Sequence, residues 1–424
     1  MSPSFCPPFP PPSEDQTDKG YRSDDDTASV TSCTSTVEWD QEPYETFQHK
    51  VLACAKQVLW PATDPADVVA TRMTGGGYNR IIGLSIRNRK GRQTKRRVIR
   101  VPRFDETANV AKDVAALQFV KQRTSIPVPR VVGFSATHDN ELGLPCMIQT
   151  RLKGEKALHV YGNYNHQARC TFAVELGGVF RQILATQSPI PGVPVFAQTG
   201  GDNPPPLGTE VQIAPFPEAG PQHGISFEDC STREPMSVLQ FIETMIEHRK
   251  QVDHSDTQDP WFEFDLLDSL LGVAREMSKH GYFDKVPHTL VHQDLQIYSI
   301  MASDAPFPGD SALTAIIDWD EACLAPAFMT CIPPQWLWGW DEELDELDET
   351  KADDTPEDVE NREIKRLFEE AAGPLYERFA YDPVYRVARI VTKYCFTPLG
   401  HNAHAEEIDA AVDEWKSIKA GLGV

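Results

Sequence analysis

The segment Leu290–Glu321, LVHQDLQIYSIMASDAPFPGDSALTAIIDWDE, decides how the 424-residue chain is organised. Two short apolar runs mark it, Thr289–Val291 at its start and Ala315–Ile317 near its end, and each leads into a polar cluster that carries acids. Short apolar runs bounded by turn residues are typical of buried strands. The Pro- and Gly-containing stretch between them predicts a hairpin connection. We therefore expect two neighbouring strands that bring Asp294 and Asp318 together.

Carboxylates at strand ends serve metal ligation, proton abstraction or ordinary solvated turns. Mg²⁺ prefers one or two carboxylate ligands, with substrate phosphates completing its shell. In phosphoryl transfer, the Asp of a His-x-Asp-x-x-x-x-Asn loop deprotonates the acceptor hydroxyl, the Asn holds a metal, and a later Asp holds the metals that bridge the phosphates. His292, Asp294 and Ser299 have this spacing, with Ser in place of Asn. Two ordinary strands that end in acidic turns are the alternative.

The segment resembles the catalytic and metal-binding loops of the aminoglycoside phosphotransferase family, and its continuation 326–338 is similar to the family's fungal members. The resemblance implies an α+β, bilobal protein-kinase-like fold, with a small antiparallel-sheet N-lobe and a larger, mainly helical C-lobe. It implies ATP or GTP and Mg²⁺ as cofactors. The implied site comprises Asp294 as catalytic base, His292 as a structural residue of the catalytic loop, Asp318 as main Mg²⁺ ligand and Ser299 as a weaker one.

Length and composition set broad limits on the chain. Its length exceeds what one hydrophobic core organises, so two lobes are expected. No apolar run is long enough to span a bilayer, and the Pro-, Ser- and Asp-rich N-terminus does not read as a secretory signal. The nine cysteines are scattered and form no Cys-x-x-Cys pair. This argues against a zinc site or a disulfide framework and favours a reducing, cytoplasmic compartment.

The net charge of −23 is concentrated in two segments. Residues 1–47 contribute −8 and residues 341–360 contribute −11, which leaves −4 for the rest. Charge in a tail and a loop says little about the folded core. It argues against nucleic-acid binding, because phosphate repulsion would have to be overcome. The acidic loop 341–360 favours a cationic small-molecule hydroxyl acceptor. The sequence indicates no membrane partner and specifies no oligomeric state.

Three segments are expected along the chain. Residues 1–45 form a disordered acidic tail, because this composition buries too little apolar surface to offset the cost of ordering. By the resemblance, residues 46–152 form the N-lobe with its nucleotide-binding sheet. Residues 153–424 form the C-lobe, which includes an excursion at 188–235, too long for an ordinary loop, and the acidic loop 341–360.

Three consecutive glycines, Gly75, Gly76 and Gly77, lie between two apolar stretches of the predicted N-lobe. They would let the backbone approach a nucleotide phosphate closely. Surface turns use the same residues, which is the alternative. The chain contains no Gly-Lys-Ser/Thr, which excludes a Walker A loop. It also lacks a Gly-x-Gly-x-x-Gly opening a βαβ unit, which argues against a dinucleotide-binding fold.

The remaining nucleotide-site predictions come from the resemblance. Arg100 occupies the third-strand position of the phosphate-binding Lys or Arg, and an Arg fork grips phosphate oxygens bidentately. Asp113, on the predicted helix 107–121, stands where the family has a Glu that pairs with the Lys or Arg of the third strand, here Arg100. The alternative is an exposed helix residue. Gln149 and Arg151 belong to the predicted hinge, where backbone groups bind adenine.

Apolar residues at helical spacing predict further helices, at 44–60, 168–187, 236–251, 262–280, 356–379, 383–395 and 403–420. Three tryptophans at alternate positions, Trp336, Trp338 and Trp340, are expected to pack against the core. A cation-binding aromatic surface is the alternative.

Two functions remain open at this point. The first is an ATP- and Mg²⁺-dependent phosphotransferase acting on a small-molecule hydroxyl. The second is a catalytically weakened pseudokinase, in which Ser299 and Asp113 mark decayed catalysis. A protein kinase is disfavoured, because the chain lacks Ala-Pro-Glu and has Asp-Trp-Asp in place of Asp-Phe-Gly. The acceptor is not specified, because related folds host different substrates.

Overall fold

The computed structural model describes residues 41–73, 75, 77–88, 90–104, 109–197, 206–216, 234–251, 260–307, 309–340, 349–397, 399 and 402–422. The chain divides into two compact units, Met1–Lys50 and Val51–Val424, and each is taken by itself. Most of the predicted tail, Gly76 and residues 341–348 of the predicted acidic loop lie outside the described residues. In the first unit, Lys50 pairs with Glu42 at 2.7 Å near the start of helix α2 (Tyr44–Leu59), which matches the predicted helix.

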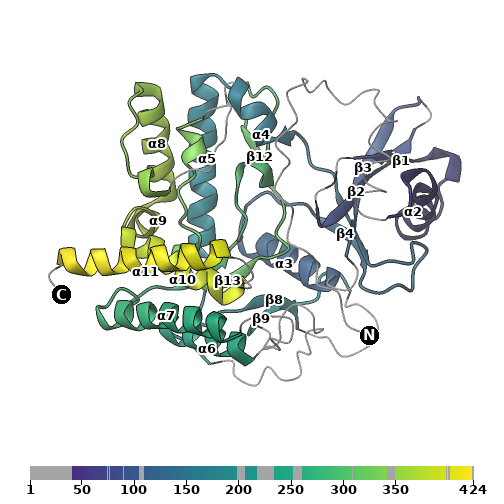
Figure 1. Ribbon diagram of the computed structural model, residues 1–424. Helices are drawn as coiled ribbons and strands as arrows, with labels where there is room; N and C mark the ends of the chain where they lie inside the picture. The colour runs from purple at the N-terminus through teal and green to yellow at the C-terminus, as the bar shows by residue number, and fades with distance from the viewer. Residues whose placement is uncertain are drawn as a thin grey trace. The chain divides into compact units, whose positions relative to one another are not determined.

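A five-stranded antiparallel sheet, ordered β1-β2-β3-β5-β4, follows in the second unit (Figure 1). Its strands are β1 (Val68–Arg72), β2 (Asn79–Arg87), β3 (Gln93–Pro102), β4 (Val131–Ser135) and β5 (Cys146–Thr150). Asn109 caps the N-terminus of helix α3 (Val110–Arg123), because its side chain accepts a hydrogen bond from the Lys112 amide. Such a cap satisfies an otherwise unpaired helix donor. As predicted, α3 buries Val110, Val114, Leu117 and Val120.

The rest of the second unit is mainly helical. Its helices are α4 (Ala157–Val160), α5 (His166–Ala185), α6 (Val238–Gln251), α7 (Pro260–Lys279), α8 (Val359–Ala372), α9 (Pro374–Ala380), α10 (Pro383–Phe396) and α11 (Asn402–Leu422). The single helix predicted at 356–379 is wrong. Gly373, at φ 88°, ends α8, and Pro374 opens α9. A positive φ favours glycine, and proline is common at the first position of a helix, so the two residues together form the boundary.

Short 3₁₀ turns complete the chain, namely η1 (Pro65–Asp67), η3 (Tyr161–Asn163), η5 (Ile297–Ser299), η6 (Ala327–Met329), η7 (Gln335–Leu337) and η8 (Glu349–Lys351). Within the predicted excursion, β7 (Gln187–Ser188) is followed by β8 (Val193–Phe196) and β9 (Val211–Ala214), which pair with each other. The predicted lobe boundary at residue 152 falls just after β5. The segment boundaries themselves stay predictions.

The strand pairing around the two acidic clusters differs from the prediction. Strand β10 (His288–Val291) pairs with β13 (Cys323–Pro326) and β7. Strand β12 (Leu313–Ile316) pairs with β11 (Ile300–Ala302), which also contacts β6 (Glu155–Lys156). The predicted hairpin between the apolar runs 289–291 and 315–317 is therefore wrong. After η5 the chain forms the unpredicted strand β11, and β11 takes the place beside β12 that the prediction gave to β10.

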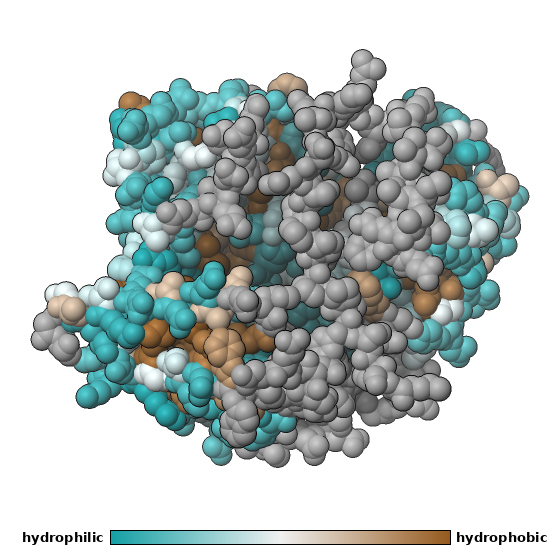
Figure 2. All heavy atoms as spheres, in the orientation of Figure 1, coloured by the Kyte–Doolittle hydropathy of each residue, from teal (hydrophilic) through white to brown (hydrophobic). Residues whose placement is uncertain are grey.

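Helices α5 and α8 lie side by side in Figure 1 and approach closely at Gly177. A Cβ atom there would lie 2.5 Å from the Phe368 carbonyl oxygen, so the contact requires glycine. Trp336 and Trp338 are buried, which confirms the predicted packing, while Trp340 is half-buried. On the face drawn in Figure 2, hydrophilic residues make up much of the coloured surface, with hydrophobic areas between them. None of the described helices combines the length and apolarity needed to cross a bilayer.

Candidate active site

Two loops carry the acidic clusters: the first follows β10 and contains Asp294, and the second follows β12 and contains Asp318 and Asp320. His292 joins them. Its side chain is buried, and Nε2 lies 2.8 Å from the Ile317 carbonyl oxygen, to which it donates. Its Nδ1 accepts the Asp294 amide at 3.3 Å. The ring also packs on Trp319, with the ring centroids 4.5 Å apart. Burial lowers the pKa of His292, so the imidazole is neutral and serves as a donor and an acceptor at once.

Ser299 closes the first loop from inside. Its hydroxyl lies 2.8 Å from both the Asp294 and the Gln296 carbonyl oxygens, and it accepts the Gln296 amide at 3.0 Å. Its own carbonyl accepts the Ile317 amide at 2.9 Å. The side chain is fully buried. This hydroxyl is engaged within the loop, and the weak metal ligation that the resemblance implied for Ser299 stays a prediction.

Both loops contain a non-glycine residue with left-handed backbone. Gln293 has φ 69° and Asp318 has φ 63°. Such a conformation costs on the order of 1 kcal/mol or more and persists where the surroundings impose it. The Gln293 side chain amide donates to the Glu321 carbonyl oxygen at 2.7 Å, which ties the first loop to the second again. The carboxylates are thus held on a constrained backbone.

Arg100 is buried on β3 and points at the second loop. Its Nη2 forms a short ion pair with Asp320 Oδ2 and lies 3.9 Å from Asp318 Oδ1. The predicted ion pair with Asp113 is not the one formed: among the described residues, the ion-pair partners of Arg100 are Asp318 and Asp320. Burial alone would lower the pKa of Arg100, but Asp320, Asp318 and Asp113 together raise it.

Asp113 belongs to the same electrostatic cluster without a direct ion pair to Arg100. Burial raises the pKa of Asp113 well above the usual aspartate range, and the Asp320 carboxylate adds to this while Arg100 opposes it. The side chain of Asp113 is shorter than that of the Glu that the resemblance implies. Asp320 forms the ion pair with the Arg100 guanidinium instead. Sequence reasoning missed Asp320, although it lies two residues after Asp318 in the same acidic cluster.

Asp318 faces an excess of negative charge. Burial raises its pKa, the Arg100 guanidinium opposes this, and the Asp320 and Asp294 carboxylates raise it further. Asp294 and Asp318 are therefore close enough to repel each other, as expected from the sequence, although their strands do not pair. Asp320 Oδ1 is buried and has no hydrogen-bond partner among the described residues. Clustered carboxylates with an unsatisfied oxygen are a donor set that fits Mg²⁺.

Asp294 projects from the first loop and is exposed. The Tyr298 hydroxyl donates to its Oδ1 at 2.7 Å. This contact was not predicted, although Tyr298 lies only four residues after Asp294 in the same loop. An exposed carboxylate oriented by a neighbouring hydroxyl is able to accept a proton from a bound molecule.

A sequence model of the phosphotransferase enzyme family (APH) matches residues 86–346, more than half of the chain. The matched span contains Arg100, both acidic loops and the helices between them. The chain belongs to this phosphotransferase enzyme family. Membership, together with the five-stranded sheet and the mainly helical remainder, confirms the recognised family and the predicted α+β, bilobal protein-kinase-like fold.

Individual relatives of this phosphotransferase family member are distant. It is 23% identical over 354 residues to a subtelomeric hrmA-associated cluster protein found in two strains of Aspergillus fumigatus, and the match covers 72% of this chain and 68% of the relative. The structure of the streptomycin-ATP-APH(2")-IIa ternary complex is similar at 10% identity, with a TM-score of 0.46, covering 88% of this chain and 96% of that one. Aminoglycoside phosphotransferase APH(4)-Ia is similar at 14% identity, with a TM-score of 0.44, covering 87% and 99%.

The other predicted nucleotide-site residues of this phosphotransferase lie on the sheet. Gly75 follows β1, and a Cβ atom there would lie 2.7 Å from the Asn79 carbonyl oxygen, so the turn requires glycine. Gly77 is half-buried. Gln149 is buried on β5, and its Oε1 has no hydrogen-bond partner among the described residues. Arg151 is exposed just after β5, and its guanidinium lies beside Gly83 of β2. Their predicted roles toward a nucleotide stay predictions.

Proposed function

We propose that this family member is an ATP- or GTP-dependent, Mg²⁺-dependent phosphotransferase that acts on the hydroxyl of a small molecule. The observation that carries the proposal is the pairing of Arg100 with the Asp318 and Asp320 carboxylates, with Asp294 near enough to help raise the pKa of Asp318. Asp294 is exposed on one loop, Asp318 and Asp320 lie on the other, and buried Arg100 faces the second loop from the sheet. A general base, a cation site and a phosphate-binding guanidinium at one place are the parts that phosphoryl transfer needs.

Asp294 is the proposed base. As the acceptor oxygen attacks the terminal phosphorus, Asp294 takes the hydroxyl proton, and the bond from phosphorus to the bridging oxygen breaks. Tyr298 orients the Asp294 carboxylate through its hydrogen bond, and His292 and Ser299 hold the loop beneath it. These three residues act on position, because their polar groups are engaged with groups of the loops themselves.

Asp318 and Asp320 would hold Mg²⁺. The ion, when bound, neutralises charge on the nucleotide phosphates. Arg100 and the turn at Gly75–Gly77 are proposed to bind the phosphates, and the segment Gln149–Arg151 is proposed to bind the base. Asp113 supports the positive charge of Arg100, whose pKa it helps to raise. The acceptor is proposed to be cationic, because the described carboxylates outnumber the cations around the base.

We place this activity in the cytoplasm. The six described cysteines, Cys54, Cys146, Cys170, Cys323, Cys331 and Cys395, are free and buried. A chain that keeps its thiols unpaired is typical of a reducing compartment.

The test is nucleotide binding by isothermal titration calorimetry, with and without Mg²⁺. Wild type is expected to bind ATP or GTP in a Mg²⁺-dependent manner, and Asp318→Asn is expected to lose that dependence. Asp310→Asn is the matched control, since Asp310 is exposed in the turn between β11 and β12. Failure of the wild type to bind either nucleotide would discard the proposal.

A second measurement addresses transfer itself. The purified protein is incubated with Mg²⁺, nucleotide and a metabolite extract, and phosphorylated products are identified by mass spectrometry. Asp294→Asn is expected to reduce turnover by about 10²–10⁴-fold, the usual contribution of a positioned base. Nucleotide binding without transfer to any acceptor would favour a pseudokinase instead.

A further inference from the structure

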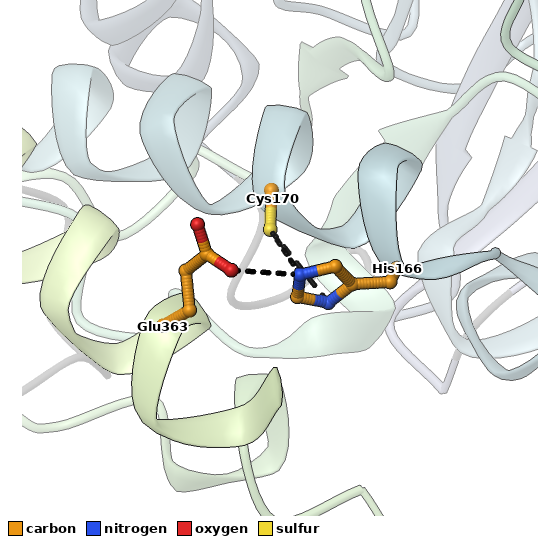
Figure 3. A group of neighbouring side chains, drawn as sticks. All are labelled: His166, Cys170 and Glu363. Carbon is orange, nitrogen blue, oxygen red and sulfur yellow. Dashed lines mark hydrogen bonds and ion pairs between the residues drawn. The ribbon is translucent and has the colours of Figure 1, made fainter. Parts of the chain in front are cut away.

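A second group of potential metal ligands lies away from the active site, where α5 faces α8. His166 and Cys170 are one helical turn apart on α5. Glu360 and Glu363 are three residues apart on α8. Residues at these spacings share one face of a helix. Figure 3 shows the Cys170 thiol and the Glu363 carboxylate directed at the imidazole of His166.

The distances between these atoms are short. His166 Nε2 lies 2.9 Å from Glu363 Oε2 and 3.5 Å from Cys170 Sγ. The three ligand atoms all lie within 4.8 Å of one another. Glu360 Oε2 lies 3.7 Å from the other ring nitrogen, Nδ1. Imidazole, thiol and carboxylate groups from two helices thus converge on one point.

We propose that His166, Cys170 and Glu363, with water as the fourth ligand, bind a zinc-class divalent ion that links α5 to α8, while Glu360 faces the other ring nitrogen of His166. A thiolate and an imidazole select Zn²⁺ and its chemical relatives, whereas Mg²⁺ and Ca²⁺ take oxygen ligands only. The proposed ion is therefore distinct in kind from the Mg²⁺ proposed for the active site.

The separations suit tetrahedral coordination. With Zn–N near 2.0–2.1 Å and Zn–S near 2.3 Å, neighbouring ligand atoms stand about 3.5 Å apart. The observed Nε2–Sγ distance has this value, but Sγ also lies 3.8 Å from Nδ1, so the half-buried imidazole must turn to direct Nε2 at a shared ion. The Nε2–Oε2 distance is shorter and must open by about half an ångström to admit the ion. Glu363 is able to make this move, because its side chain is 48% exposed.

The described surroundings carry an excess of negative charge. Burial raises the pKa of the Cys170 thiol, and the Glu363 and Glu360 carboxylates raise it further, while Arg366 opposes them. Arg366 itself is paired with Glu370 at 2.5 Å. Binding of the ion would displace the thiol proton to water and neutralise the carboxylates. In sequence this set carries no zinc-finger spacing, because its ligands come from two helices that are far apart in the chain.

A simpler account is a hydrogen bond between His166 and Glu363 that connects the helices without any metal. The two accounts differ in one observable, the thiolate–metal bond. Co²⁺ substitutes for Zn²⁺ and gives a thiolate charge-transfer band in the near ultraviolet together with visible bands of tetrahedral geometry. A hydrogen-bonded pair gives neither.

The experiment is a Co²⁺ titration of the full-length, tag-free apoprotein, followed by back-titration with Zn²⁺. Wild type is expected to bind one equivalent with the charge-transfer band, which Zn²⁺ abolishes. Cys170→Ser should lose the band, and Glu363→Gln should weaken binding by more than about tenfold, because one of the bonds to the ion is lost. Glu370→Gln, on the same helix but outside the group, should behave as wild type. Zn²⁺ should also raise the melting temperature of wild type and not of Cys170→Ser.

The absence of the band in wild type would overturn the proposal. So would a band that survives Cys170→Ser and His166→Asn, because it would belong to other thiols. Glu363→Gln keeps the test valid if the other variants fold poorly, since Glu363 is half-exposed and its substitution leaves the helix core intact. Equal Co²⁺ affinity in Glu363→Gln and Glu370→Gln would likewise refute the assigned ligand set.

Discussion

The ion pair between Arg100 and Asp320 gives a quantitative test of how the site is built. The Arg100 side chain is 7% exposed and that of Asp320 is 22% exposed. Removing one member of a buried pair costs about 3–5 kcal/mol, because a charge is left buried without its partner. Asp318 remains 3.9 Å from the guanidinium after Asp320→Asn. We therefore expect this variant to lose only about 2–3 kcal/mol of unfolding free energy.

The assay is a double-mutant cycle by chemical denaturation, with Asp320→Asn, Arg100→Met and the double variant. If the pair is formed, the double variant loses less stability than the sum of the single losses, by about 1–3 kcal/mol. Glu321→Gln is the matched control. Its carboxylate is 71% exposed and pairs with Lys112 at 3.1 Å. A surface pair of this kind contributes at most about 1 kcal/mol.

Two results would refute this reasoning. One is a strictly additive cycle, which would mean that the two side chains do not interact. The other is a loss in Asp320→Asn no larger than the loss in Glu321→Gln, which would place Asp320 in solvent and not beside the buried guanidinium.

Three further predictions concern the loops and the helix contact. Ser299→Asn should lower the unfolding free energy by about 1–3 kcal/mol, since it breaks the buried hydroxyl network, without increasing transfer; a gain of transfer would mark the wild type as a decayed kinase. Because burial raises the pKa of Asp318 and only its ionised form binds Mg²⁺, calorimetric Mg²⁺–nucleotide affinity should fall as pH is lowered through that raised pKa; a flat profile would contradict this role. Gly177→Ala should destabilise by about 1–3 kcal/mol through the contact with Phe368, whereas Gly178→Ala, with nothing within 4 Å, should stabilise by about 0.5–1 kcal/mol. If Gly177→Ala and Gly178→Ala shift the denaturation midpoint in the same direction, the close contact between α5 and α8 at Gly177 is ruled out.

Sequence pattern was sufficient where the signal lies between near neighbours. The apolar spacing of Val110, Val114, Leu117 and Val120 predicts the buried face of α3, because residues three and four apart share a helix side. The long helices of the C-terminal part follow in the same way. The break at Gly373 was missed because a single glycine inside a periodic stretch is often tolerated, and only its positive φ makes it a boundary.

Pattern was insufficient where the outcome depends on groups far apart in the chain. Strand β12 pairs with β11, a three-residue strand too short to show a period, while β10 pairs with β13. The hydrogen bonds of the Ser299 hydroxyl are local, but they depend on the backbone course of the loop, which residue spacing does not encode. The ion pair between Arg100 and Asp320 joins a sheet strand to a loop 220 residues later. Local residue spacing does not encode such a contact.

The left-handed backbone at Gln293 and Asp318 restricts which substitutions are informative at this site. Asparagine, aspartate and glycine adopt this conformation at low cost, whereas β-branched side chains are strongly disfavoured there. In a saturation library, both positions should enrich the same small set of residues regardless of charge. Asparagine at position 318 therefore removes the carboxylate while preserving the course of the chain, and a valine there would confuse a lost ligand with a displaced loop.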